Sequence, residues 1–244
     1  MTTQVKIDRG AGIAVWRQIS EWLKTEIAAG RFAEGARLPA EADIASRFEV
    51  NRHTVRRAIA VLTSEGILRA DQGRGTFVAS APISYPIGAR TRFSEIVSGQ
   101  DRTPSGRMIG SSVEPADAVI AEALSVSAGA PLLRIETLRV ADGTPVLVGT
   151  SWFDQARFPG LVAAYAETGS FTRALELCGV PDYTRKETRV TAELVAAADA
   201  ALLGLEPGQP VLVVESVNVD PVDAPVQYTR TRMAAERIQL VIEN

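Results

Sequence analysis

The sequence predicts an α+β protein of two domains, an N-terminal winged helix-turn-helix and a larger C-terminal domain built on an antiparallel sheet. Two features predict this class. Residues 38–78 read as two short helices followed by a glycine-rich hairpin, and residues 129–140 have a second copy at residues 208–219. The chain has 244 residues, 46% of them hydrophobic, which is enough to give each domain its own core.

A stretch with two prolines separates the domains. Pro82 and Pro86 lie among small residues, and a proline disfavours helix at the residue before it, so we expect an extended linker here. The predicted boundaries are residues 1–79 for the first domain, 80–90 for the linker and 91–244 for the second domain.

The first domain is expected to contain three helices. Residues 14–29 have apolar side chains at helical spacing and are followed by Gly30. A second helix starts after Pro39, whose missing N–H needs no partner at a helix start. Asn51 is a good N-cap for the third helix. The buried stripe of that third helix is formed by Val55, Ala58, Ile59 and Leu62.

The opposite side of the third helix is basic. Its first two turns carry Arg52, His53, Arg56 and Arg57, which suits a helix that enters the major groove of DNA. An ordinary surface helix with basic residues is the alternative. The preceding short helix and the hairpin after Gly66 favour the DNA-binding interpretation, and Arg37 stands where a phosphate contact would be natural.

The pattern LPAE…FEVNRHTVRRAI…EGIL…QGRGTFV resembles the DNA-binding domain of the GntR family of bacterial transcription regulators. The resemblance implies operator contacts in the third helix and in the wing. Some relatives have an arginine where this chain has Ala42, so a base preference is not carried over. The residues predicted to contact DNA are Arg37, Asn51, Arg52, His53, Thr54, Arg56, Arg57, Gly73 and Arg74.

The second domain contains an internal repeat of helix, strand, hairpin and strand. Each copy has a helix with Ala-Asp-Ala near its start, and a second strand that begins Pro-Val, at Pro145 and at Pro225. Asp142-Gly143 is a strong hairpin signal. Two such units are expected to pair into one antiparallel sheet with helices on a face. Further strands are expected at residues 107–113, 184–194 and 237–242, and helices between 158 and 178.

This second domain resembles the UTRA effector domain of HutC-type GntR regulators, whose fold is similar to chorismate lyase. The resemblance covers about residues 85–244. Residues 84–86 and 90–94, taken with the helix-turn-helix pattern, more narrowly resemble regulators of phosphonate metabolism of the PhnF type.

The resemblance implies an effector site. In relatives with anionic ligands, a strand arginine before the hairpin, an F-[ST]-E loop and a serine after a glycine hold the anion. Strand alternation places Thr137 on the same face as the arginine, and the second repeat copy is expected to supply the other half of the pocket. The predicted site consists of Arg92, Phe93, Ser94, Thr137, Arg139, Ser170, Gln227 and Tyr228.

Several departures favour a small anion. Relatives that bind sugar phosphates have a second strand arginine, two glutamates and a tyrosine where this chain has Thr137, Gly149, Gln227 and Met233. Without carboxylates to hold sugar hydroxyls, a phosphonate, phosphate or carboxylate is the expected ligand. The alternative for Arg139 is a salt bridge with a surface carboxylate.

Composition excludes several other classes. The single histidine and single cysteine argue against a metal site, a cofactor, an internal disulfide and a Ser-His-Asp triad. No run of about 18 apolar residues and no signal-peptide core is present, so we expect a cytoplasmic protein without a membrane segment. The net charge of −3 divides into +3 for residues 1–78 and −6 for the remainder, which suits a DNA-binding head on an acidic body.

The sequence therefore predicts a homodimeric transcription regulator, a repressor released from a palindromic operator by a small anionic effector. Two alternatives stay open. One is a lyase-like enzyme with a DNA-binding head, which the lone histidine disfavours. The other is a protein that coats DNA without specificity, which the acidic body disfavours.

Overall fold

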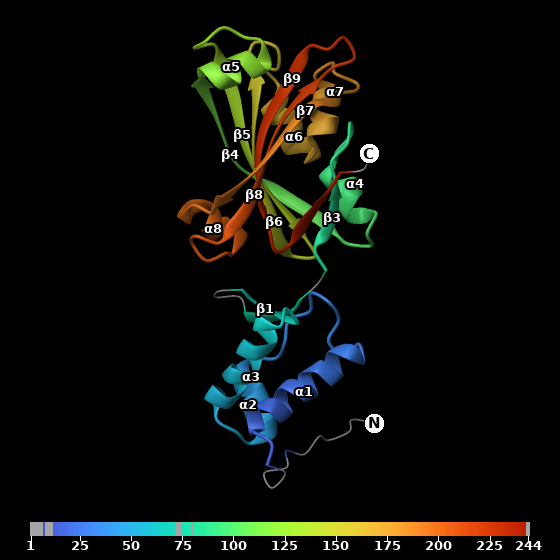
Figure 1. Ribbon diagram of the computed structural model, residues 1–244. Coiled ribbons are helices and arrows are strands. Elements are labelled where there is room, and N and C mark those ends of the chain that lie inside the picture. Colours follow the sequence, from blue (N-terminus) through green and yellow to red (C-terminus); the bar gives the residue numbers. More distant parts are fainter. Residues whose placement is uncertain (1–6, 8–11, 72–74, 80, 243–244) are drawn as a thin grey trace. The chain divides into compact units, whose positions relative to one another are not determined.

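The computed structural model describes residues 7, 12–71, 75–79 and 81–242 (Figure 1). The chain forms two compact units, Met1–Ala81 and Pro82–Asn244. Helices dominate the first unit and a six-stranded antiparallel sheet dominates the second. The predicted α+β class, with a winged helix-turn-helix and an antiparallel-sheet domain, is confirmed. Among the described residues, no helix is long and apolar enough to cross a membrane.

The first unit has three helices and a two-stranded wing. Its elements are α1 (Val15–Ala28), α2 (Glu41–Phe48), α3 (Arg52–Ser64), β1 (Leu68–Asp71) and β2 (Gly75–Val78). The two wing strands are antiparallel, with Leu68 opposite Val78. The predicted stripe of α3 is buried throughout and packs with Ile19 and Leu23 of α1 in one core.

The turn between α2 and α3 follows from its residues. α2 ends at Phe48, and the next residue, Glu49, has a left-handed backbone (φ 52°) that turns the chain. Asn51 then caps α3, because its Oδ1 accepts the backbone N–H of His53 at 2.9 Å. The N-cap prediction for Asn51 is confirmed. The turn and the cap together fix where α3 begins and so which side of it is exposed.

The second unit is organised by the repeat. The sheet has the order β4-β5-β6-β9-β8-β7, with antiparallel neighbours throughout. The two copies, β4-α5-β5-β6 and β7-α8-β8-β9, therefore meet at β6 and β9. The repeat predicted that the two units pair into one antiparallel sheet, and this is confirmed. The strands are β4 (Pro104–Pro115), β5 (Pro131–Ala141), β6 (Thr144–Asp154), β7 (Thr184–Leu194), β8 (Pro210–Val219) and β9 (Pro225–Ala234).

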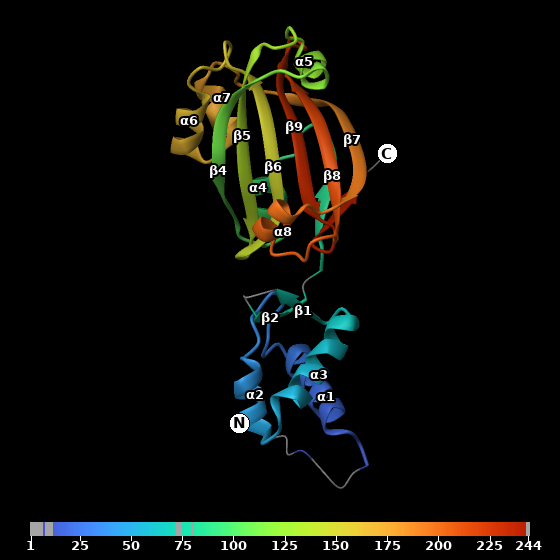
Figure 2. The same ribbon diagram turned by 90° about the vertical axis from the view of Figure 1, so that its left-hand side faces the viewer.

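Different elements cover the two faces of the sheet, as Figure 2 shows for α8 in front and α4 behind. The repeats supply α5 (Ala118–Leu124) and α8 (Ala197–Leu203), which pack on one face. The other face is covered by elements outside the repeats, namely α4 (Phe93–Ser98), α6 (Leu161–Thr168), α7 (Phe171–Leu177) and a small pair of strands. The repeat predicted helices on one face of the sheet only. The layer on the other face could not be predicted from the repeat, because it is built from segments that lie between and outside the two copies.

That small pair is β3 (Ile83–Pro86) with β10 (Ile238–Val241), which run parallel. Residues 83–86 are extended, as Pro82 and Pro86 favour, but they pair within the second unit. The stretch predicted as a linker over residues 80–90 therefore includes a strand of that unit. Sequence reasoning missed this strand because its partner lies at the far end of the chain.

Candidate DNA-binding and effector sites

The candidate nucleic-acid interface lies on the first two turns of α3. Arg52, His53, Arg56 and Arg57 are exposed, Thr54 is half-buried, and the intervening Val55 is completely buried. The buried stripe fixes the helix against its neighbours and leaves the basic side exposed to solvent. The structure thus places these predicted residues together on one accessible surface.

Two of the arginines have partners within the unit. The guanidinium of Arg56 donates to the carboxylate of Glu41 on α2, with Nη2 to Oε2 at 2.8 Å. This bond, against the effect of burial, holds the pKa of Glu41 below its ordinary value, and the charges of Arg56 and Arg52 add to it. The guanidinium of Arg57 lies 4.8 Å from the ring centre of Trp16. Arg57 therefore packs partly on α1.

Arg37 lies beside the wing. Its backbone forms a bridge with Phe77, and its guanidinium fills the space next to Gly75, where a Cβ would approach Arg37 Nε to 2.8 Å. Gly75 also has a φ of +114°, which favours glycine. The wing-tip residues Gly73 and Arg74, predicted to contact DNA, lie outside the described residues.

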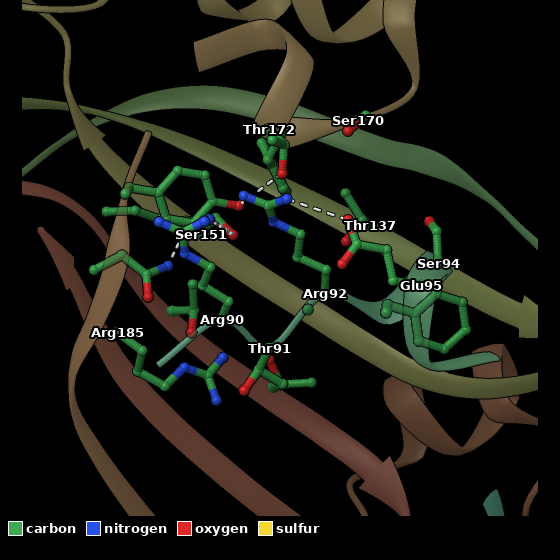
Figure 3. Close-up of a pocket in the computed structure, with 18 of the residues that line it drawn as sticks. Arg90, Thr91, Arg92, Ser94, Glu95, Thr137, Ser151, Ser170, Thr172 and Arg185 are labelled. Atoms are coloured by element: carbon green, nitrogen blue, oxygen red, sulfur yellow. Dashed lines mark hydrogen bonds and ion pairs between the residues drawn. The ribbon is translucent and has the colours of Figure 1, made fainter. Parts of the chain in front are cut away.

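The candidate effector site is a cavity of about 660 Å³ in the second unit, on the face of the sheet that carries α4, α7 and β3 (Figure 3). It brings together residues from segments far apart in the sequence. Seven of the eight predicted effector residues line it, namely Arg92, Phe93, Ser94, Thr137, Arg139, Ser170 and Gln227.

Tyr228 does not line this cavity, and its prediction is wrong. Successive residues of a strand face opposite sides of a sheet, so Gln227 and Tyr228 cannot both line it. The Tyr228 hydroxyl donates to Glu215 at 3.0 Å on the other face, where its ring packs beside Trp152. Burial, together with this bond, raises the pKa of Tyr228 to about 12.

Arg139 extends into the cavity from β5. Its Nη1 lies 3.4 Å from the carbonyl oxygen of Gly169, and its guanidinium is 5.9 Å from the ring centre of Tyr165. It forms no ion pair with any of the described residues, so the salt bridge considered as an alternative is not seen there. Opposite it on β4 stands Gly106, where a Cβ would lie 2.5 Å from the Leu138 carbonyl and 3.0 Å from Arg139 Cδ.

Other arginines of the cavity are paired with its carboxylates. Arg92 contacts Glu95 at 3.1 Å and Asp182 at 3.8 Å, and Arg90 is also bonded to Asp182. Arg173 pairs with Glu176 at 3.1 Å. The bond to Glu95, against burial, raises the pKa of Arg92. In total, five arginines and three carboxylates line the cavity, which leaves a formal charge of +2.

The floor of the cavity is neutral and hydrogen-bonded. Asn218 Nδ2 donates to Gln227 Oε1 at 2.7 Å, and Gln227 Nε2 donates to Ser151 Oγ at 3.0 Å. All three side chains are buried. Ser151 Oγ accepts this bond, and its O–H has no acceptor among the described residues, so it is available to donate to a ligand.

Sequence reasoning missed several lining residues. Thr229 and Thr231 follow Gln227 at every second position of β9, so strand alternation alone could have found them. Tyr85 and Arg185 gave no such signal, because one lies on β3 and the other on an edge strand. Within the described part of the chain, no cluster of three or more His, Cys, Asp or Glu residues could hold a metal ion.

Comparison with known families matches both units. Residues 16–78 match the bacterial regulatory proteins of the gntR family, and residues 99–239 match the UTRA domain. The cavity described above thus lies within the unit that matches UTRA, and α3 lies within the segment that matches gntR.

Individual relatives agree with this. An uncharacterized HTH-type transcriptional regulator of Rhizobium meliloti is 40% identical over 238 residues, covering 97% of this chain and 98% of the relative. The HTH-type transcriptional repressor PhnF of Mycolicibacterium smegmatis is 31% identical over 212 residues, covering 85% and 86%. The crystal structure of PhnF from Mycobacterium smegmatis aligns with a TM-score of 0.66 at 28% identity, over 93% of this chain and 98% of that one. These names are those of transcription regulators and not of enzymes.

Proposed function

The chain belongs to the gntR family of bacterial regulatory proteins and carries a UTRA domain, and on that premise we propose that it is a repressor released from a palindromic operator by a small anion. As a member of this family it is a ligand-responsive DNA-binding transcription regulator. The observation that carries the proposed effector class is Arg139, a cation inside the cavity without a carboxylate partner among the described residues.

The head is proposed to read DNA with the start of α3. Arg52 and His53 are exposed at the first turn, next to the cap formed by Asn51. Residues at the N-terminal end of a recognition helix reach base edges in the major groove. Arg56, held by Glu41, and Arg37, held beside the wing, are proposed to contact the same duplex.

The cavity is proposed to take a phosphonate, phosphate or carboxylate. A guanidinium binds such oxyanions through two parallel hydrogen bonds. The formal charge of the lining is +2, and its floor offers neutral hydroxyl and amide groups instead of carboxylates. A volume of about 660 Å³ is within the range of small-molecule sites. Gly149 and Gln227, both in the lining, leave no carboxylate at the positions where sugar-phosphate-binding relatives hold hydroxyl groups.

The regulator is proposed to act as a homodimer. The two edge strands of the sheet expose apolar side chains, Val113 on β4 and Leu194 on β7, and exposed edge strands need covering. A two-fold dimer with one head per subunit reads a palindromic operator. The anion must bind one arrangement of the heads better than the other, because equal affinity would shift nothing.

Footprinting on the DNA upstream of the gene that encodes this chain tests the proposal. We expect a two-fold symmetric footprint, which inorganic phosphate, methylphosphonate or acetate reduces when added. Arg52→Ala should abolish specific binding while the fold is retained, because a good base contact contributes about 1–3 kcal/mol and a dimer loses it twice. Unchanged binding by Arg52→Ala, or a monomer in light scattering of the full chain, would contradict the corresponding part of the proposal.

A further inference from the structure

Arg185, near the start of β7, is a second cation in the cavity without a carboxylate partner. Its Nε and Nη1 are shielded from solvent, and neither has a hydrogen-bond partner among the residues that the structure describes. Its backbone is fixed, because its N–H donates to the carbonyl of Ala89 at 2.8 Å. Burial lowers the pKa of Arg185, against the effect of Tyr85 and Tyr183. Buried donors without partners cost free energy, so their presence calls for an explanation.

The carboxylates of the cavity do not supply the missing partner. Glu95 is paired with Arg92, Glu176 with Arg173, and Asp182 with both Arg90 and Arg92. Figure 3 shows Arg185 among the same lining residues as Arg90 and Arg92. The protein thus neutralises three of its five lining arginines and leaves Arg139 and Arg185.

The repeat relates these two arginines. In the first copy, Arg139 of β5 lies opposite Gly106 of the edge strand β4. In the second copy, Asn218 of β8 stands at the position of Arg139, and the residue opposite it on the edge strand β7 is Arg185. Each half of the sheet therefore contributes one unpaired cation, from an inner strand in one copy and from the edge strand in the other.

Arg139 and Arg185 line the cavity from opposite halves of the sheet. The hydroxyl of Tyr85 is buried, which raises its pKa, and the charges of Arg185 and Arg139 both oppose that shift. Between the two halves lies the neutral floor that includes Ser151, Thr229 and Thr231. A ligand that reaches both arginines would cross hydroxyl groups and meet a charge at each end.

We propose that Arg185 is a second anion-binding residue and that the effector carries two acidic groups, one bound by Arg139 and the other by Arg185. The inference rests on the proposed function and narrows its ligand class. The ligand is a small molecule in which two carboxylate, phosphate or phosphonate groups are joined by a short uncharged chain. A single small anion would leave one of the two guanidinium groups without a partner.

Calorimetry on the full chain tests this with matched pairs of compounds that differ by one acidic group. The pairs are ethylphosphonate with phosphonoacetate, propylphosphonate with 3-phosphonopropionate, and butyrate with succinate. Wild type should bind the two-acid member of at least one pair at least tenfold more tightly. Arg185→Gln should reduce that difference to about twofold and leave the affinity for the one-acid member unchanged. Arg134→Gln is the control, since Arg134 does not line the cavity and pairs with Glu136 on the opposite face of the sheet, and it should keep the difference.

Thermal unfolding without ligand gives an independent readout. If Arg185 is retained for a ligand, Arg185→Met removes a guanidinium whose Nε and Nη1 are shielded from solvent without a partner among the described residues, and it should raise Tm by ~2–4 °C. A fall in Tm would instead show that the side chain stabilises the fold, and would contradict the proposal.

The remaining outcomes separate this inference from the proposed function. If one-acid compounds bind in an Arg139-dependent manner and a second acid adds nothing in any pair, the inference is wrong and the anion-responsive regulator stands. If Arg185→Gln keeps the full preference for two acids, the second subsite lies elsewhere and the inference is also wrong. If wild type binds no compound of either kind, both the inference and the proposed effector class fail.

Discussion

The two halves of the sheet share one backbone plan but place their polar groups differently. Arg139 and Leu147 in the first half correspond to Asn218 and Gln227 in the second, and all four line the cavity. The first half thus combines a cation with an apolar neighbour. The second half has a pair of amides that bond to each other and to Ser151.

This difference shows how a duplicated fold makes an asymmetric site. The strand order and the helices α5 and α8 are repeated, because they bury the same apolar positions in each copy. The residues that face the cavity are free of that requirement and differ between copies. Specificity is therefore expected to depend on the side chains that break the repeat.

The largest expected effect follows from removing the cation of the first half. Arg139→Ala should leave operator binding intact and weaken anion binding at least tenfold, so that the variant represses constitutively. Charge-assisted hydrogen bonds contribute roughly 1.5–3 kcal/mol each, and 1.4 kcal/mol corresponds to a factor of ten. Gel shifts with phosphate or methylphosphonate titrated in would measure the release.

Arg134→Ala is the matched control for this prediction. Arg134 lies on the same strand but on the opposite face, where it pairs with Glu136 at 2.6 Å. Its loss should change release by less than about twofold, since successive strand residues face opposite sides of the sheet and Arg134 does not line the cavity. Wild-type anion binding by Arg139→Ala would show that the anion is held elsewhere.

Sequence reasoning reached those parts of the site that local patterns determine. The stripe of α3 follows from helical periodicity, and the repeat placed Arg139 and Gln227 in one cavity. The error at Tyr228 came from treating two neighbouring strand residues as one group. Arg185 was missed because its environment depends on cross-strand register and on the chain near Ala89, which no local pattern shows.

A smaller effect on anion binding is expected from Gly106, whose position in the second half of the sheet is occupied by Arg185. Gly106→Ala should destabilise the fold by about 1–3 kcal/mol, because its Cβ would lie 2.5 Å from the backbone oxygen of Leu138. It should also displace Arg139 and weaken anion binding. Urea unfolding measures the first effect and calorimetry the second.

Gly110→Ala on the same strand provides the comparison. A Cβ there meets no described atom within 4 Å. Its free energy of unfolding should equal that of wild type or exceed it by about 0.4–1 kcal/mol, because alanine reduces the entropy of the unfolded chain. Equal stability of the two variants would mean that β4 can move away from β5 at Gly106.

The smallest effect concerns the hairpin turns, where each half has one aspartate bonded to an arginine. Asp142 accepts from Arg102 at 2.7 Å and from the N–H of Thr103, and Asp220 accepts from Arg157 at 2.5 Å and from two backbone N–H groups. Burial would raise the pKa of both carboxyls, but these donors outweigh it and hold each pKa below its ordinary value.

A carboxyl whose pKa is lowered by folding stabilises the protein above its unfolded pKa, about 3.9, and that contribution is lost as the pH falls towards the folded value.

The Asp220 side chain is 10% exposed and that of Asp142 is 39% exposed, so solvent screens the first half's pair more strongly. At pH 7, Asp220→Asn should therefore cost about 1 kcal/mol and Asp142→Asn less than about 0.5 kcal/mol. Urea unfolding between pH 3 and 7 should show both variants converging with wild type below about pH 4. Parallel pH profiles for wild type and Asp220→Asn would mean that the charge of this carboxylate does not contribute, and that its backbone hydrogen bonds alone hold the turn.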